Sequence, residues 1–292
     1  MNRFCSCAPL ALSALLAAGA ADAKPLVFGG KLPLTRGATS VEGAAGAGLA
    51  TWALIAGQAT EDGVGAAFFA TAIPLSNYDF TAYGAGIGLF DRVEVSYARQ
   101  NFDTGETGAA LGLGEGFTFA QDIVGAKIRV FGDAVYAQDS WLPQVAIGAQ
   151  FKRTEHEGLV AALGATNDSG VDLYVAATKI VLDQSLVLNG TIRFTEANQF
   201  GLLGFGGDRD DGRSAQIELS GAYLATDRLL IGAEYRSRPD NLGFAREDDA
   251  YDLFAAYALT DAVTVVAGYA ALGDIATFAD QRGAYLSLQV GF

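Results

Sequence analysis

The chain has 292 residues, a formal net charge of −14, 51% hydrophobic residues and 37 glycines. Its acidic surface would repel phosphate groups, which disfavours nucleic acid as a partner. Only two cysteines, Cys5 and Cys7, and one histidine, His156, are present. Thiolate chemistry and His-dependent hydrolysis therefore have few candidate residues.

The first 23 residues are typical of a secretory signal peptide. Arg3 precedes an uncharged apolar run over about 8–21, and Ala21-Asp22-Ala23 matches a small-residue cleavage site. The apolar run is too short to be a spanning helix. We expect cleavage after Ala23, which would remove both cysteines and leave a mature chain without disulfides.

The remaining chain shows the two-residue periodicity of short β-strands. Segments of roughly ten residues alternate apolar and polar side chains between turn residues. The predicted strands are 45–57, 64–73, 78–90, 92–101, 122–131, 143–152, 171–181, 185–195, 215–224, 228–237, 250–258, 262–271 and 283–292. A tilted strand of about 9–11 residues is long enough to cross the hydrocarbon core of a bilayer.

This pattern predicts an all-β fold, a transmembrane antiparallel up-and-down β-barrel in the outer membrane. The barrel must close because lipid offers no partner to an edge strand. An even strand number would keep both chain ends in the periplasm, so we expect about 14 strands, with a weak first strand within 25–36. The alternative is 12 strands, with 24–44 as a periplasmic or lumenal segment. In either case 45–292 is the predicted barrel.

A helical membrane protein is less consistent with the sequence. The best candidate span, 43–60, is uncharged but contains four glycines, each of which destabilises a helix. Aromatic residues also suit a barrel, because they fall near the predicted strand ends, as in interfacial belts. They are Phe194, Tyr235, Tyr251 and Tyr269 at the end with long loops, and Tyr223, Tyr257 and Phe292 at the end with tight turns.

Several long stretches resemble an uncharacterised proteobacterial family, domain of unknown function 3034. They are 41–57, 111–136, 198–211, 238–258 and 280–292. The resemblance covers nearly all of the expected mature chain. It implies an outer-membrane protein and implies no catalytic or ligand-binding residues.

The chain ends in "GAYLSLQVGF", an alternating strand that finishes on Phe292. This ending resembles the sorting signal of outer-membrane barrels, although Ser287 stands where a glycine is usual. The resemblance implies that the barrel-assembly machinery is a partner during insertion. The other expected partners are the lipid bilayer and lipopolysaccharide, the latter through divalent ions bridged to acidic outer loops.

The inward-facing positions of the predicted strands carry five acids and five bases. They are Glu94, Lys127, Arg129, Lys152, Asp172, Arg193, Glu218, Glu234, Arg236 and Asp252. A wet, polar interior suits a channel or uptake pore for small hydrophilic solutes of unknown identity. The alternative is a plugged or structural barrel, or one that contacts other surface molecules, whose interior is filled by its own ion pairs. Gly and Ala line the N-terminal strands, which leaves space for residues 24–44 as a plug.

Enzymatic activity and a cofactor are not expected. An outer-membrane hydrolase is a less favoured alternative, but His156 lies in a predicted outer loop, where we expect it to be solvated. Asp208, Asp210 and Asp211 partly follow the spacing of a calcium loop. No bidentate glutamate follows at the usual distance, so a dedicated metal site is not expected.

Overall fold

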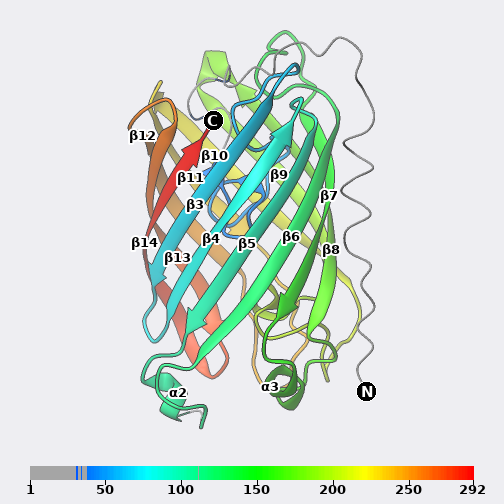
Figure 1. Ribbon diagram of the computed structural model, residues 1–292, viewed down its shortest axis with the longest axis vertical. Helices are drawn as coiled ribbons and strands as arrows, with labels where there is room; N and C mark the ends of the chain where they lie inside the picture. Colours follow the sequence, from blue (N-terminus) through cyan, green and yellow to red (C-terminus); the bar gives the residue numbers. More distant parts are fainter. Residues whose placement is uncertain (1–30, 32–33, 35–37, 111) are drawn as a thin grey trace, which may run out of the picture.

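The computed structural model describes residues 31, 34, 38–110 and 112–292. Twelve antiparallel strands form one closed, tilted barrel (Figure 1). The strands are β3 (Val64–Pro74), β4 (Asp79–Leu89), β5 (Val93–Asp103), β6 (Thr118–Phe131), β7 (Gln144–Thr154), β8 (Ser169–Val181), β9 (Leu186–Thr195), β10 (Ser214–Thr226), β11 (Leu229–Arg236), β12 (Ala250–Ala258), β13 (Val263–Ile275) and β14 (Phe278–Gly291). Neighbours in the barrel are neighbours in sequence, except where β14 closes on β3.

Barrel closure explains the alternating C-terminal strand. Leu286 pairs with Ala72 and Val290 with Phe68, so β14 has a partner on both sides. The backbone of Phe292 extends this pairing through hydrogen bonds in both directions with Ala66, 2.8 and 3.1 Å long. The prediction of a closed antiparallel barrel is confirmed.

The predicted count of 14 strands is wrong, and the alternative of 12 is correct. Residues 45–57 do not join the wall, so the predicted barrel start at residue 45 is also wrong. Within 38–62 the structure has only β1 (Ala38–Thr39) and β2 (Ala45–Gly46), which pair with each other. Small residues dominate this stretch, so it offers little apolar surface to lipid but fits inside a barrel.

Residues 38–62 instead lie inside the barrel and are called the lumenal segment below. Figure 1 shows this segment in blue, enclosed by the strands. Trp52, near its middle, is 1% exposed and donates from Nε1 to Ser220 Oγ of β10 at 2.9 Å. The predicted signal peptide and cleavage site lie outside the described residues, as does most of the predicted strand within 25–36.

The two faces of the wall are reversed relative to a soluble barrel. On β14, Leu286 and Leu288 point outward and are at least half exposed, whereas Tyr285, Ser287 and Gln289 point inward and are buried. Apolar side chains that face outward around a closed barrel match a lipid-facing surface. This is the arrangement of an outer-membrane barrel. Among the described residues, no helix has the length and apolar character needed to cross a bilayer.

The barrel has two different ends. The turn end carries the connections 90–92, 182–185, 227–228 and 259–262, the longer connection 132–143, and Phe292. The loop end carries 104–117 with α2 (Thr107–Ala110), 155–168 with α3 (Glu157–Ala162), 196–213 and 237–249. The predicted strands 262–271 and 283–292 are joined by a tight turn, because β13 extends to Ile275 and β14 begins at Phe278.

Candidate functional site: the lumen and its internal segment

All ten charged residues singled out on the strands lie on the inner face of the barrel. Each is 4% exposed or less. Two-residue periodicity explains this placement, because every second side chain of a strand points to the same face. The sequence suggested that these side chains line a water-filled lumen. They are dry here, because the lumenal segment fills the space between them.

Glu42 of the lumenal segment lies at the centre of a buried ionic cluster. Its carboxylate is 2.5 Å from Lys152 Nζ, 2.9 Å from Arg236 Nη2 and 3.3 Å from Arg193 Nη2. The wall contributes two more carboxylates: Asp172 is 2.8 Å from Lys152, and Glu218 is 2.5 Å from Arg193.

These distances define a charge balance. Three cations of the wall face only two carboxylates of the wall, and Glu42 supplies the third. A buried charge without a partner is strongly unfavourable, so the lumenal segment completes the electrostatics of this barrel. Sequence reasoning missed Glu42. The available signal was that it is the only charged residue between positions 38 and 60.

A second group holds the backbone of the lumenal segment from the β5–β6 side. Glu94 and Lys127 pair at 3.0 Å and are fully buried. Glu94 accepts hydrogen bonds from the backbone N–H groups of Ala45 at 3.2 Å and Ala56 at 2.8 Å. Lys127 Nζ donates to the carbonyl oxygens of Ala45 and Trp52. These wall side chains take the place of a β-ladder between the lumenal segment and the barrel strands.

The opposite wall makes equivalent contacts. Glu234 accepts from the backbone N–H of Leu49 at 2.6 Å, and Glu218 accepts from that of Thr51 at 2.8 Å. Asp252 accepts a hydrogen bond from Tyr285 Oη at 2.8 Å, beside Gly48. A Cβ on Gly48 would lie 2.7 Å from Asp252 Oδ2, so a larger residue there would require the Asp252 side chain to shift.

Arg129 lies apart from the central cluster, near the turn end. It pairs with Asp91 at 2.7 Å, and Asp91 also contacts Lys31 at 2.6 Å. Lys31 Nζ donates to Ile55 O of the lumenal segment at 3.1 Å. At the same end, Gln58 donates from its backbone N–H to Phe292 O at 2.7 Å. The C-terminus therefore contacts the lumenal segment as well as β3.

Small residues on β4 make room for the segment. Gly84, Gly86 and Gly88 face inward, and a Cβ on Gly88 would overlap the carbonyl oxygen of Ala56. A Cβ on Gly86 would lie 3.1 Å from Ala56 Cβ. We expected Gly and Ala on the first strands to leave space for a plug, and Gly86 and Gly88 of β4 do lie against the lumenal segment. The segment that fills this space runs to residue 62, not to 44.

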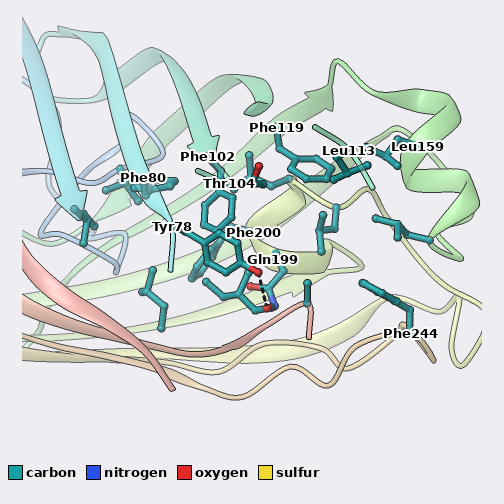
Figure 2. A pocket seen from close by; sticks show the side chains of 18 of the residues that line it. Tyr78, Phe80, Phe102, Thr104, Leu113, Phe119, Leu159, Gln199, Phe200 and Phe244 are labelled. Atoms are coloured by element: carbon teal, nitrogen blue, oxygen red, sulfur yellow. Dashed lines mark hydrogen bonds between the residues drawn. The ribbon is translucent and has the colours of Figure 1, made fainter. Parts of the chain in front are cut away.

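A cavity of about 170 Å³ lies between the lumenal segment and the loop end (Figure 2). Val41 and Leu49 of the segment form part of its lining. Phe80, Phe102 and Phe119 contribute from the wall, and the loops add a further group of mostly apolar side chains. That group includes Tyr78, Leu113, Leu159, Phe200, Leu203 and Phe244.

Two titratable groups near this cavity have shifted pKa values because they are buried. Burial raises the pKa of the Tyr78 hydroxyl to about 12. Burial also raises the pKa of Glu247 to about 7, against the opposing effects of nearby Arg238 and the Gln199 backbone N–H. Glu247 accepts that backbone hydrogen bond at 2.8 Å. Tyr78 therefore remains neutral at physiological pH, and Glu247 titrates near neutrality.

The remaining candidate residues do not form a common site. His156 is not solvated as expected: its ring lies 4.9 Å from that of Phe117, and Nε2 is 2.9 Å from Thr118 O. Asp208 accepts from the backbone N–H of Gly243, whereas Asp210 accepts from that of Gly212. Within the described residues, no group of three or more His, Cys, Asp or Glu side chains could hold a metal ion.

Comparison with solved structures recovers the same architecture. The porin KdgM in complex with disordered oligogalacturonate aligns with a TM-score of 0.51 and 8% identity, over 77% of this chain and 99% of that one. Two further structures each align with a TM-score of 0.45 and 10% identity. Outer membrane phospholipase A from Escherichia coli aligns over 77% of this chain and 92% of that one. Omp33 from Acinetobacter baumannii aligns over 78% of this chain and 97% of that one. At such identities the likeness shows the fold alone.

Sequence comparison is more specific about the family. No protein with a curated description matches the chain. One family model, described as "Protein of unknown function (DUF3034)", matches residues 35–289. This match covers the lumenal segment and almost the whole barrel, so the chain belongs to the DUF3034 family.

Proposed function

We propose that this protein is a gated outer-membrane channel for small hydrophilic solutes, held closed by its lumenal segment. The observation that carries the proposal is the position of Glu42 among Lys152, Arg193 and Arg236. The segment is held by side chains of the wall and is not one of the hydrogen-bonded strands of the barrel. It can therefore move while all twelve wall strands remain paired. The inner wall would then expose charged and amide groups to water.

The second candidate is a permanently closed structural barrel. The dryness of the ionic cluster favours it, because buried charge pairs resist the loss of either partner. The two candidates differ in one respect. In a gated channel, weakening the contacts of Glu42 produces conductance, whereas in a structural barrel it only lowers stability.

Single-channel recording of Glu42→Gln in planar bilayers tests this difference. The amide keeps the shape of the side chain but removes the charge that balances the wall cations. We expect rare openings in the natural protein and frequent, discrete openings in the variant. Asp62→Asn is the matched control, because Asp62 is an exposed carboxylate at the end of the same segment. The control should behave like the natural protein.

An engineered disulfide shows whether the lumenal segment is the gate. A Cβ on Gly86 would lie 3.1 Å from Ala56 Cβ, slightly below the usual separation of about 3.5–4.5 Å in disulfides. Adding Ala56→Cys and Gly86→Cys to Glu42→Gln should abolish the openings under oxidising conditions and restore them on reduction. Openings that persist in the oxidised form, or their absence in both forms, would contradict the proposal.

A further inference from the structure

The loop-end cavity has the size of a small-molecule site. Its volume is about 170 Å³, and its lining is dominated by Phe, Leu, Ile and Val side chains. An apolar protein cavity of about 150 Å³ stays dry and can hold benzene. The volume therefore suits a single aromatic or alicyclic ring.

The polar groups of the lining are already engaged within the protein. Thr104 donates from Oγ1 to Phe117 O at 2.7 Å. The Gln199 amide donates to Asp274 O at 3.1 Å and accepts from Arg238 at 2.7 Å. Tyr78 Oη lies 3.4 Å from Ile275 O, to which it can donate. A polar ligand would lose its hydrogen bonds to water here without gaining equivalent ones.

Nearby cations do not make the cavity an anion site. Arg238 donates to the carbonyl oxygens of Asp248 and Leu272 and to Gln199 Oε1. Arg236 contacts Glu42 and Glu218. Both guanidinium groups lie over the ring of Phe200, at 4.6 Å for Arg236 and 5.1 Å for Arg238. Phe200 lines the cavity, whereas neither Arg236 nor Arg238 does.

The backbone at the edge of the cavity is held in a costly conformation. Gln199 and Phe200 have φ values of 46° and 62°, in the left-handed region that non-glycine residues rarely adopt. Such strain persists only where the surroundings fix it, and it is common at binding sites. Here the strained turn directs the Phe200 ring into the lining of the cavity, as Figure 2 shows.

The cavity reaches the surface beside Phe244. This residue lines the cavity and is also 39% exposed on the connection 237–249. We infer that the cavity is a binding site for an uncharged hydrocarbon about the size of benzene, which enters from the loop end past Phe244. This inference does not depend on gating, because the cavity exists while the lumenal segment is in place.

Methyl NMR of the full-length protein in detergent micelles, titrated with toluene, tests the site. Ile73 and Ile275 line the cavity, whereas Ile128 and Ile217 face the lipid side and report toluene that partitions into the micelle. We expect saturable shifts at the first pair and only linear drift at the second. Benzoate, a charged analogue of similar size, should bind at least about tenfold more weakly.

Two variants that fill the cavity complete the experiment. Leu159→Trp and Leu113→Trp introduce a larger side chain from two different loops and should each abolish the saturable shifts. Leu182→Trp at the turn end is the matched control and should bind as the natural protein does. Unchanged Ile128 and Ile217 signals show that a variant is folded. Linear drift at all four isoleucines, saturation that survives in both folded variants, or equal binding of benzoate would overturn the inference.

Discussion

The guanidinium group of Arg236 lies 4.6 Å from the centre of the Phe200 ring. Arg236 belongs to the ionic cluster around Glu42, and Phe200 lines the loop-end cavity. Phe200 O also accepts a hydrogen bond from Lys152 Nζ at 3.2 Å. One residue therefore contacts both the group that holds the lumenal segment and the space proposed to bind an apolar molecule.

Arg193→Ala should strongly destabilise the barrel. Arg193 is 1% exposed, contacts Glu42, Asp172 and Glu218, and lies over the ring of Tyr174. Its removal leaves buried carboxylates unpaired, and we expect the free energy of unfolding to fall by ~3–5 kcal/mol. Equilibrium unfolding in urea, with the folded fraction read from heat-dependent gel mobility, measures this loss of unfolding free energy.

Arg153→Ala is the matched control for this substitution. Arg153 lies on β7, two strands away from Arg193, and points outward. Its side chain is largely exposed, and Nε lies 3.3 Å from Asp168 Oδ2. An exposed pair of this kind is worth ~0–1 kcal/mol. Equal stability losses in the two variants would show that the lumen is hydrated rather than dry.

Gly88→Ala should dislodge the lumenal segment. The added methyl group would overlap the carbonyl oxygen of Ala56, a backbone atom that cannot rotate away. Overpacking of this kind costs about 1–3 kcal/mol, and the segment is not part of the hydrogen-bonded wall of twelve strands. We expect more frequent channel openings in planar bilayers than in the natural protein.

The control for this substitution is Gly221→Ala on β10. A Cβ at Gly221 meets no atom within 4 Å, so the methyl group has open space. Openings should remain as rare as in the natural protein. If Gly88→Ala also leaves the bilayer current unchanged while the protein folds normally, the segment tolerates displacement without opening a path.

The stability of the connection 237–249 should fall as pH rises from about 4.5 to about 7. Burial raises the pKa of Glu247 to about 7 from an ordinary value of 4.5, so the folded state holds a proton that the unfolded state releases in this interval. The free energy of local opening therefore falls with rising pH, by at most about 1.4 kcal/mol per unit, and levels off above pH 7.

Hydrogen exchange of this connection between pH 4 and pH 8, corrected for intrinsic rates, measures the effect. Arg238 and Asp240 are the charged groups that influence the pKa of Glu247. Glu247→Gln should remove the pH dependence, because the amide stays neutral. The same change at exposed Glu115 should leave it intact. If the pH dependence of exchange survives Glu247→Gln, another titratable group causes it.

The C-terminal ring should matter for insertion rather than for the folded barrel. The Phe292 ring is half exposed on the lipid side, while its carbonyl oxygen accepts from Gln58 and Ala66. Phe292→Ala keeps these backbone contacts and removes only the aromatic group. We expect a severalfold lower yield in outer membranes but nearly unchanged stability of the refolded protein. Normal membrane yield would refute a sorting role.

The sequence alone determined that the chain forms a closed antiparallel barrel, and it determined the face on which the side chains of the strands after residue 64 lie. Two-residue periodicity assigns the side of every residue, so the alternation by itself places Arg193, Glu218 and Glu234 inside and Leu286 and Leu288 outside. The strand register is strongly constrained, because a shift of one residue would turn every side chain of a strand to the opposite face of the wall.

Only the tertiary structure decided the strand number and the contents of the lumen. The stretch 45–57 has weak alternation, and its backbone groups are satisfied by Glu94, Lys127 and Glu234 from strands far along the chain. No local pattern records such contacts. The balance between Glu42 and the three wall cations, and the apolar cavity that several loops enclose, likewise arise only when the closed barrel brings distant residues together.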